Sequence, residues 1–231
     1  MSCQAGADSA VGRRTRVRLR CLSVVVLQGS LLDGGAESGP RPFGPLIRRT
    51  ELADGAWVDL RRDWIAGADR LFERLLTAVP WRGERRPMYD RMVDVPRLLA
   101  FYGDQDRLPD DLLVEARQAL TGRYARELGG NQATVGLCLY RDGKDSVAWH
   151  GDTIGRGAVS DTIVAIVSLG ARRRFLLKPR SGGTAMRFEL GGGDLLVMGG
   201  SCQRTWVHAV PKTARPVGAR ISIQFRPPGV R

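Results

Sequence analysis

The sequence contains few of the residues that build disulfide frameworks and structural metal clusters. Among its 231 residues are four cysteines, Cys3, Cys21, Cys138 and Cys202, and none of them forms a Cys-x-x-Cys pair. This low count argues against a disulfide-stabilised fold and a structural zinc site, and it favours a reducing, cytoplasmic location. No apolar run approaches the roughly 20 residues that span a bilayer, so no membrane partner is expected.

Acidic residues are outnumbered by basic ones. The chain has 36 Lys and Arg against 24 Asp and Glu, which gives a formal net charge of +12. Residues 1–26 hold five Arg and one Asp, so they account for +4, and the remainder still carries +8. Such a surface attracts polyanions, nucleic acid first among them. A basic protein without a polyanion partner is the alternative, because charge alone constrains function weakly.

Helical periodicity is confined to the part of the chain before residue 129. A first helix is predicted from Asp63, as its N-cap, to the residue before Pro80, because apolar residues recur there at helical spacing. A second helix is predicted from about Pro109 to Leu128, where Gly129 and the glycine after it end the pattern.

The segment between these two helices, residues 81–95, looks irregular and is rich in arginine. Basic side chains close to Trp81, Tyr89 and Tyr102 suit a lid over nucleic acid, because charge contacts phosphate and rings stack on bases. A solvated loop with anchoring aromatic residues is an equally good interpretation.

After residue 132 the apolar pattern changes from helical to alternating. Short runs separated by glycine-containing turns are typical of a jelly roll or a β-sandwich, and no internal repeat or second domain is visible. About eight strands are predicted, at 133–141, 147–150, 162–169, 173–178, 185–190, 194–199, 205–210 and 219–226.

The last predicted strand has one apolar and one polar face. Ile221, Ile223 and Phe225 lie on one side. The opposite, polar side carries Arg220, Ser222, Gln224 and Arg226. This polar face either meets solvent or lines a cavity that holds an anion.

Both histidines of the chain belong to one pattern, His150-Gly151-Asp152 followed by His208. Two imidazoles and one carboxylate are the ligand set of a non-haem Fe(II) centre, which leaves other metal positions open for oxygen and a co-substrate. His-x-Asp alone occurs by chance in many proteins. Together with the arginines of the last strand it favours a cavity for a keto diacid, whose distal carboxylate needs a cationic anchor.

The region from about residue 93 to 226 resembles the AlkB family of Fe(II)- and 2-oxoglutarate-dependent dioxygenases. Residues 24–92 would not have identified the family. The matching segments occur in the family's order and spacing, and they are Val95-Pro96-Arg97, Tyr102-Gly103-Asp104, Leu139-Tyr140-Arg141-Asp142-Gly143, Trp149-His150-Gly151-Asp152, Ser168-Leu169-Gly170-Ala171, Gly193-Asp194-Leu195-Leu196-Val197-Met198, His208-Ala209-Val210-Pro211-Lys212 and Arg220-Ile221-Ser222-Ile223-Gln224-Phe225-Arg226.

The resemblance implies a fold class and a domain organisation. The expected class is α+β, mainly β, with a double-stranded β-helix (jelly roll) core and two flanking N-terminal helices. Residues 1–23 are expected to form a disordered basic extension, and 24–231 a single dioxygenase domain. Within that domain, 24–108 would supply the N-terminal part and a nucleotide-recognition lid, and 109–231 the helix and the core.

The resemblance also implies the site residues. His150, Asp152 and His208 would ligate Fe(II) and form the catalytic centre, with O2 as co-substrate. The 2-oxoglutarate would be held by Tyr140, Arg220, Ser222 and Arg226. Where the family often has asparagine, this chain has Cys138 and Ser222; a serine still hydrogen-bonds, but a cysteine is a poor replacement.

The implied activity is oxidative demethylation of N-alkylated bases in DNA or RNA, a direct reversal of alkylation damage. The base would have to be single-stranded or flipped out of a duplex. A monomer is expected. Base preference is not implied, because several repair members have an acidic residue after the His-x-Asp and this chain has Thr153 and Ile154. Candidate substrate-binding residues are Arg97, Tyr102, Trp149 and Arg172.

Other functions remain open at this point. An AlkB-type oxygenase acting on a modified tRNA or a protein side chain would share the iron site. A non-catalytic nucleic-acid-binding protein on the same scaffold is a different class, but it has no need of the triad and the paired arginines. A structural zinc in the same ligand set is disfavoured by the predicted open coordination and the anion-binding strand.

Overall fold

The computed structural model describes residues 38–88, 91–128 and 134–230. The predicted disorder of residues 1–23 therefore lies outside the described residues, as do residues 24–37 of the predicted domain. Within the described part no helix is long and apolar enough to cross a membrane.

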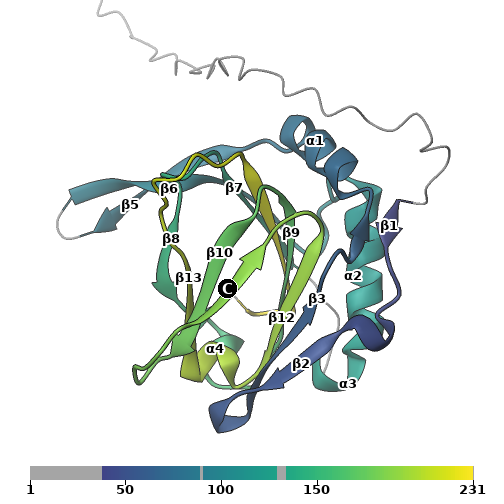
Figure 1. Ribbon diagram of the computed structural model, residues 1–231, viewed down its shortest axis with the longest axis vertical. Coiled ribbons are helices and arrows are strands. Elements are labelled where there is room, and N and C mark those ends of the chain that lie inside the picture. Colours follow the sequence, from purple (N-terminus) through teal and green to yellow (C-terminus); the bar gives the residue numbers. More distant parts are fainter. Residues whose placement is uncertain (1–37, 89–90, 129–133, 231) are drawn as a thin grey trace, which may run out of the picture. The chain divides into compact units, whose positions relative to one another are not determined.

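Two antiparallel sheets form the centre of the described structure (Figure 1). The larger sheet has the order β2 (Arg48–Glu51), β3 (Ala56–Arg61), β12 (Asp194–Gly200), β9 (Val164–Gly170), β14 (Arg220–Arg226), β7 (Thr134–Tyr140), β6 (Arg91–Tyr102) and β5 (Arg82–Met88). The smaller sheet has the order β11 (Met186–Leu190), β10 (Arg173–Pro179), β13 (Trp206–Val210) and β8 (Val147–His150). The prediction of a mainly β, jelly-roll core with two flanking helices is confirmed, and the eight predicted strands are β7 to β14 with ends within two residues.

The larger sheet is covered on both faces. Buried residues of α1 (Ala68–Ala78) and α2 (Asp111–Arg123) join one apolar cluster with Val135, Ile221 and Phe225. A second cluster lies between the sheets, where Ile166 and Leu196 meet Phe175 of the smaller sheet. The helices thus cover one face of the larger sheet, and the smaller sheet faces the other.

The start of the first helix was predicted four residues too early. Asp63 is not an N-cap: it lies in a turn with φ +50°, and its N–H donates to the Asp194 carboxylate. The short strand β4 (Ile65–Ala66) follows and pairs with β1 (Gly39–Pro40), and Gly67 then caps α1. The apolar spacing continued through β4, which made the strand look like helix.

The second helix also begins later than predicted. Pro109 was predicted as its first residue, but the helix begins at Asp111; Asp110 is the N-cap, and its carboxylate accepts a hydrogen bond from the Leu112 N–H at 3.0 Å. Tyr124 has non-helical angles and interrupts the helix, so Leu128 ends a separate short helix, α3 (Ala125–Leu128).

The arginine-rich segment predicted to be irregular is a β-hairpin, so that prediction was wrong. β5 pairs with β6, and β5 is one of the two edge strands of the larger sheet. Charged side chains are common on edge strands, where they deter pairing with other chains, and they masked the alternation. The hairpin extends the sheet beside β7.

A buried carboxylate joins the outer strands to the end of α2. Asp59 of β3 accepts two hydrogen bonds from Arg49 at 2.8 Å each, and a third from the Tyr124 hydroxyl at 2.9 Å. Asp59 is buried, so its removal would leave the Tyr124 hydroxyl and the Arg49 guanidinium without their hydrogen-bond acceptor.

We therefore expect Asp59→Ala to lower the free energy of unfolding by roughly 2–4 kcal/mol, because two partners lose their acceptor. Tyr124→Phe should cost about 1 kcal/mol, because only one hydrogen bond is lost. Urea denaturation measures both. Equal midpoints for wild type and Asp59→Ala would contradict the role given to this carboxylate.

Candidate metal centre and substrate cleft

The three predicted metal ligands lie together on the smaller sheet and the loop that leaves it. His150 ends β8 and His208 stands opposite it on β13, so strand pairing makes the two imidazoles neighbours. Their ring centres are 4.2 Å apart. Asp152 follows two residues after His150. One ligand atom from each of the three residues lies within 4.8 Å of the others, which suits a single metal ion.

Each histidine is prepared to act as a neutral ligand. His150 Nδ1 lies 2.8 Å from the Ala148 carbonyl, which can only accept, so Nδ1 carries the proton and Nε2 keeps its lone pair. Burial, reinforced by the neighbouring His150, lowers the pKa of His208 to about 3. Phe175 stacks on the His208 ring at 5.3 Å and fixes its orientation. A neutral imidazole is what a metal requires.

Asp152 is held as a carboxylate. Burial opposes its ionisation, but the positive charge of Arg226 and the hydrogen bond that Arg226 donates lower the pKa of Asp152, with a contribution from the adjoining histidine rings. Arg226 Nε donates to the Asp152 carboxylate at 2.9 Å. The Asp152 N–H donates to the Gln203 side chain at 2.9 Å, which anchors the loop from the other side.

Gly151, between the two ligands, is required by close packing. A Cβ at this position would lie 2.6 Å from the Gln203 carbonyl of α4 (Cys202–Thr205). A side chain there would push the loop away from α4 and displace Asp152. The residue inside His-x-Asp is thus glycine for a steric reason that the motif alone does not reveal.

A small inner cavity of about 70 Å³ lies beside the metal ligands, between the two sheets. Tyr140, Ser222 and Arg226, three of the four residues predicted to hold the co-substrate, line it. Burial raises the pKa of the Tyr140 hydroxyl to about 12, so this group is a hydrogen-bond donor at neutral pH. The Ser222 hydroxyl already accepts from Gln224 at 2.7 Å, which leaves its proton available to an acceptor in the cavity.

Arg220, the fourth of these residues, is fully buried next to Tyr140, with its guanidinium carbon 5.2 Å from the ring centre. It donates to the Ser168 hydroxyl at 2.7 Å, but Nε and Nη1 have no hydrogen-bond partner among the described residues. Burial lowers the pKa of Arg220. A buried guanidinium with unused donors calls for an anion, and a carboxylate of 2-oxoglutarate is one of matching shape.

Arg173 provides an internal comparison. It is also buried beside the Tyr140 ring, at 5.8 Å, yet it donates to the carbonyls of Asp142, Asp145 and Pro211 at 2.8–2.9 Å. Its donors are directed at the backbone, whereas Nε and Nη1 of Arg220 are left open. The ligand set and the open donors of Arg220 therefore fit Fe(II) and 2-oxoglutarate.

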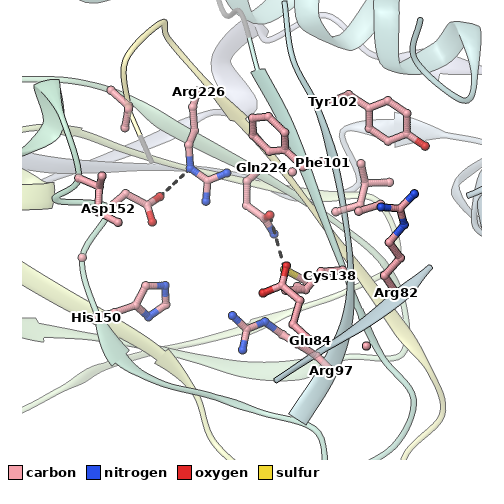
Figure 2. A pocket seen from close by; sticks show the side chains of 18 of the residues that line it. Arg82, Glu84, Arg97, Phe101, Tyr102, Cys138, His150, Asp152, Gln224 and Arg226 are labelled. Atoms are coloured by element: carbon pink, nitrogen blue, oxygen red, sulfur yellow. Dashed lines mark hydrogen bonds and ion pairs between the residues drawn. The ribbon is translucent and has the colours of Figure 1, made fainter. Parts of the chain in front are cut away.

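Figure 2 shows side chains that line a larger outer cleft of about 1070 Å³. This cleft meets the inner cavity at the metal ligands. Arg97, Cys138, His150, Asp152, Gln224 and Arg226 line both spaces. The hairpin forms one side of the cleft, and Thr153 and Ile154 border it after Asp152. Phe101 and Ile154, 53% and 68% exposed, offer apolar surface to a flat ligand.

The structure separates the four predicted substrate-binding residues into two pairs. Arg97 and Tyr102 line the cleft, although Tyr102 also packs against the helix-side core. Trp149 does not line it: it alternates with His150 along β8, and Lys178 lies 4.5 Å from its ring. Arg172 does not line it either, because Asp194 holds it at 3.1 Å.

Three cleft residues were not singled out from the sequence. Phe101 was passed over in favour of its neighbour Tyr102, although both line the cleft. Gln224 was recognised only as part of a polar face. Glu84 was hidden in the segment predicted to be irregular, and no local signal marked it.

Metal binding is the first testable property of this site. We expect excess Mn(II), a redox-stable probe of the Fe(II) site, to raise the melting temperature of the wild type by roughly 5–10 °C, because a ligand that binds only the folded state stabilises it. Asp152→Asn should abolish the shift. Asp145→Asn, a buried carboxylate outside the ligand set, should retain it. A shift that survives Asp152→Asn would place the metal elsewhere.

The two buried arginines give a matched pair for co-substrate binding. Arg220→Lys should raise the KM for 2-oxoglutarate roughly 10- to 100-fold, because lysine keeps the charge and loses the fork. Arg173→Lys should lower the melting temperature and leave that KM unchanged, because its partners are backbone carbonyls. Succinate formation measures the KM. An equal rise in both variants would contradict the assignment of the anion to Arg220.

Comparisons with known proteins agree with this geometry. Residues 102–226 match the model of the 2OG-Fe(II) oxygenase superfamily. The chain is 32% identical over 213 residues to alpha-ketoglutarate-dependent dioxygenase alkB homolog 3 of Bos taurus, covering 84% of this chain and 70% of the relative. It is 26% identical over 224 residues to DNA oxidative demethylase ALKBH2 of Mus musculus, covering 84% of this chain and 92% of the relative.

A solved structure supports the fold. A prolyl hydroxylase from Trichoplax adhaerens, in complex with a hypoxia inducible factor peptide fragment, superposes with a TM-score of 0.53 at 12% identity, covering 73% of this chain and 83% of that one. From the superfamily match, the identity to relatives over most of the chain and the shared fold, we conclude that this chain belongs to the AlkB family and is an Fe(II)- and 2-oxoglutarate-dependent dioxygenase.

Proposed function

We propose that this enzyme removes alkyl groups oxidatively from N-alkylated bases of DNA or RNA and so reverses alkylation damage directly. The observation that carries the proposal is the position of the metal ligands, where a small anion-binding cavity meets a cleft of about 1070 Å³ lined by arginines and exposed apolar side chains. The names of the relatives, a DNA oxidative demethylase among them, support the same substrate class.

The protein's share of the chemistry follows from the two spaces. When bound, iron and 2-oxoglutarate supply the activation of O2, with 2-oxoglutarate converted to succinate and carbon dioxide. His150, Asp152 and His208 would hold the iron from one side and leave its other positions open. Tyr140, Ser222 and Arg226, which line the inner cavity, and Arg220, which is buried beside Tyr140, would hold the co-substrate, while the outer cleft admits the base.

The cleft suits an extruded base rather than a stacked one. A base inside a duplex cannot reach ligands that lie at the bottom of such a cleft, so the substrate would be single-stranded or flipped. Phe101 provides a ring for stacking. Arg82 and Arg97 lie on the hairpin side of the cleft, where cations attract the phosphates that flank the base. We propose that the enzyme acts as a monomer, in the reducing cytoplasm.

The proposal is tested with a single-stranded oligonucleotide carrying 1-methyladenine or 3-methylcytosine. After anaerobic loading with Fe(II), addition of 2-oxoglutarate and air should remove the methyl group and form succinate in equal amount. Oligonucleotide mass and succinate are followed together.

The control is His208→Ala, which removes one metal ligand and should form neither product. Succinate without demethylation in the wild type would mean an oxygenase with a different substrate, and would overturn the proposed function while leaving the enzyme class intact. Demethylation by His208→Ala would contradict the assigned centre.

A further inference from the structure

The outer cleft has an uneven charge. Among the described residues that line it, Arg82, Arg97 and Arg226 carry positive charge, and Asp152 and Glu84 carry negative charge. Asp152 is a metal ligand and accepts a hydrogen bond from Arg226. Glu84 is thus the one lining carboxylate outside the metal centre in the described part of the cleft.

The backbone presents Glu84 to the cleft in two ways. Arg82 and Glu84 alternate with Gly83 along β5, so they share the face that borders the cleft. The pairing between β5 and β6 is also irregular at this point. Gly83 stands opposite Leu98 and Arg85 opposite Asp94, so β6 advances by four residues where β5 advances by two. Figure 2 shows the Glu84 side chain pointing into the cleft, on the same side as Arg97.

An irregularity of this kind bends a strand and redirects side chains, and it is over-represented next to active sites. Here the additional residues of β6 include Pro96, which has no N–H, and its carbonyl accepts a hydrogen bond from the Ser146 N–H at 2.8 Å. Arg97 Nη1 donates to the Ser146 carbonyl at 3.2 Å. These contacts tie the irregular part of β6 to the chain just before β8, so the position opposite Glu84 is fixed relative to the metal ligands.

The substrate class of the proposed function gives this carboxylate a task. Methylation of N1 of adenine or N3 of cytosine places a positive charge on the ring next to an exocyclic amino group. Arg82 and Arg97 attract phosphate but repel such a ring, whereas Arg226 is paired with Asp152. A carboxylate attracts the charge and accepts a hydrogen bond from the amino group. The segment after Asp152 supplies Thr153 and Ile154 to the cleft, neither of which carries a charge.

We infer that Glu84 of the β5–β6 hairpin recognises the alkylated base by its positive charge and exocyclic amino group, and that it makes the enzyme favour cationic lesions over neutral ones. This inference rests on the proposed function, whose substrate class it narrows. Glu84 is a specificity residue at the base and takes no part in holding the metal or the co-substrate.

The test compares two lesions of nearly the same shape in one oligonucleotide sequence. 3-Methylcytosine is cationic and has an exocyclic amino group, whereas 3-methylthymine is neutral and has a carbonyl at that position. The variant is Glu84→Gln, which keeps the shape of the side chain and removes its charge. The matched control is Asp94→Asn on the same hairpin, where Asp94 is exposed, pairs with Arg85 at 3.1 Å and does not line the cleft.

Two quantities are measured for each protein and lesion: kcat/KM for demethylation, and the dissociation constant by fluorescence anisotropy in the absence of O2. The wild type should favour 3-methylcytosine. Glu84→Gln should reduce that preference roughly tenfold in both quantities, because a charge-assisted hydrogen bond is lost. Binding and demethylation of the cationic lesion should weaken, and those of the neutral lesion should stay the same. Asp94→Asn should leave the preference unchanged.

The outcomes separate this inference from the proposed function. Three outcomes would overturn the role of Glu84: a wild type that does not prefer either lesion, a Glu84→Gln variant that loses activity equally on both lesions, or an Asp94→Asn variant whose preference falls as much as that of Glu84→Gln. Equal loss of activity on both lesions would mean that Glu84 only shapes the hairpin. If the wild type demethylates neither lesion, the proposed function fails. The ratio of the dissociation constants for the two lesions, and its change in Glu84→Gln, would then still decide whether Glu84 recognises the positive charge of the base.

Discussion

The register of β14 is the constraint on which the rest of this structure depends. This strand lies between β9 and β7 in the larger sheet, with Ile221, Ile223 and Phe225 packed against the helix-side core. A slip of one residue would exchange these side chains for Arg220, Ser222 and Gln224. The apolar core thereby holds the polar face toward the smaller sheet, where the inner cavity lies. The stability of the fold and the position of the co-substrate residues thus both depend on the register of β14.

The polar face carries groups whose burial opposes folding. Arg220 is buried with two unused donor atoms, and the buried Asp152 keeps its negative charge because Arg226 pairs with it. Such groups are stable in the interior when a partner satisfies them. A metal at the three ligands and a dicarboxylate at Arg220 would supply these partners. Folding and ligand binding are therefore expected to be coupled through the same few side chains.

The hairpin of β5 and β6 is the element that we propose makes the oxygenase centre selective for its substrate. It places arginines, Phe101 and Glu84 above ligands that other strands provide. Arginine suits the phosphate that every nucleic acid presents, so it adds affinity without discriminating among bases. Selection by base requires a group that senses what alkylation changes, and ring charge is the property that a carboxylate senses best. The hairpin thus carries both groups: arginines that attract phosphate, and Glu84, beside the irregular pairing, which recognises the base.

Much of this organisation could be predicted from the sequence, because it depends on local periodicity and on residue chemistry. Alternation located β7 to β14, and the rarity of histidine directed attention to His150, Asp152 and His208. Resemblance to a family supplied Tyr140 and Arg220 as their companions. The helix starts and the hairpin were missed, because charged edge strands and the short β4 lack a distinctive local pattern.

What only the tertiary structure decided concerns contacts between segments distant in the chain. Asp152 and Arg226 are 74 residues apart, and only sheet packing brings them to 2.9 Å. The need for glycine at position 151 comes from α4, some fifty residues later. Trp149 and Arg172 looked suited to substrate, but the pleat of β8 and the carboxylate of Asp194 place them outside the cleft. Residue chemistry determined which groups this protein has to use, and the packing of the two sheets determined which of them face the same space.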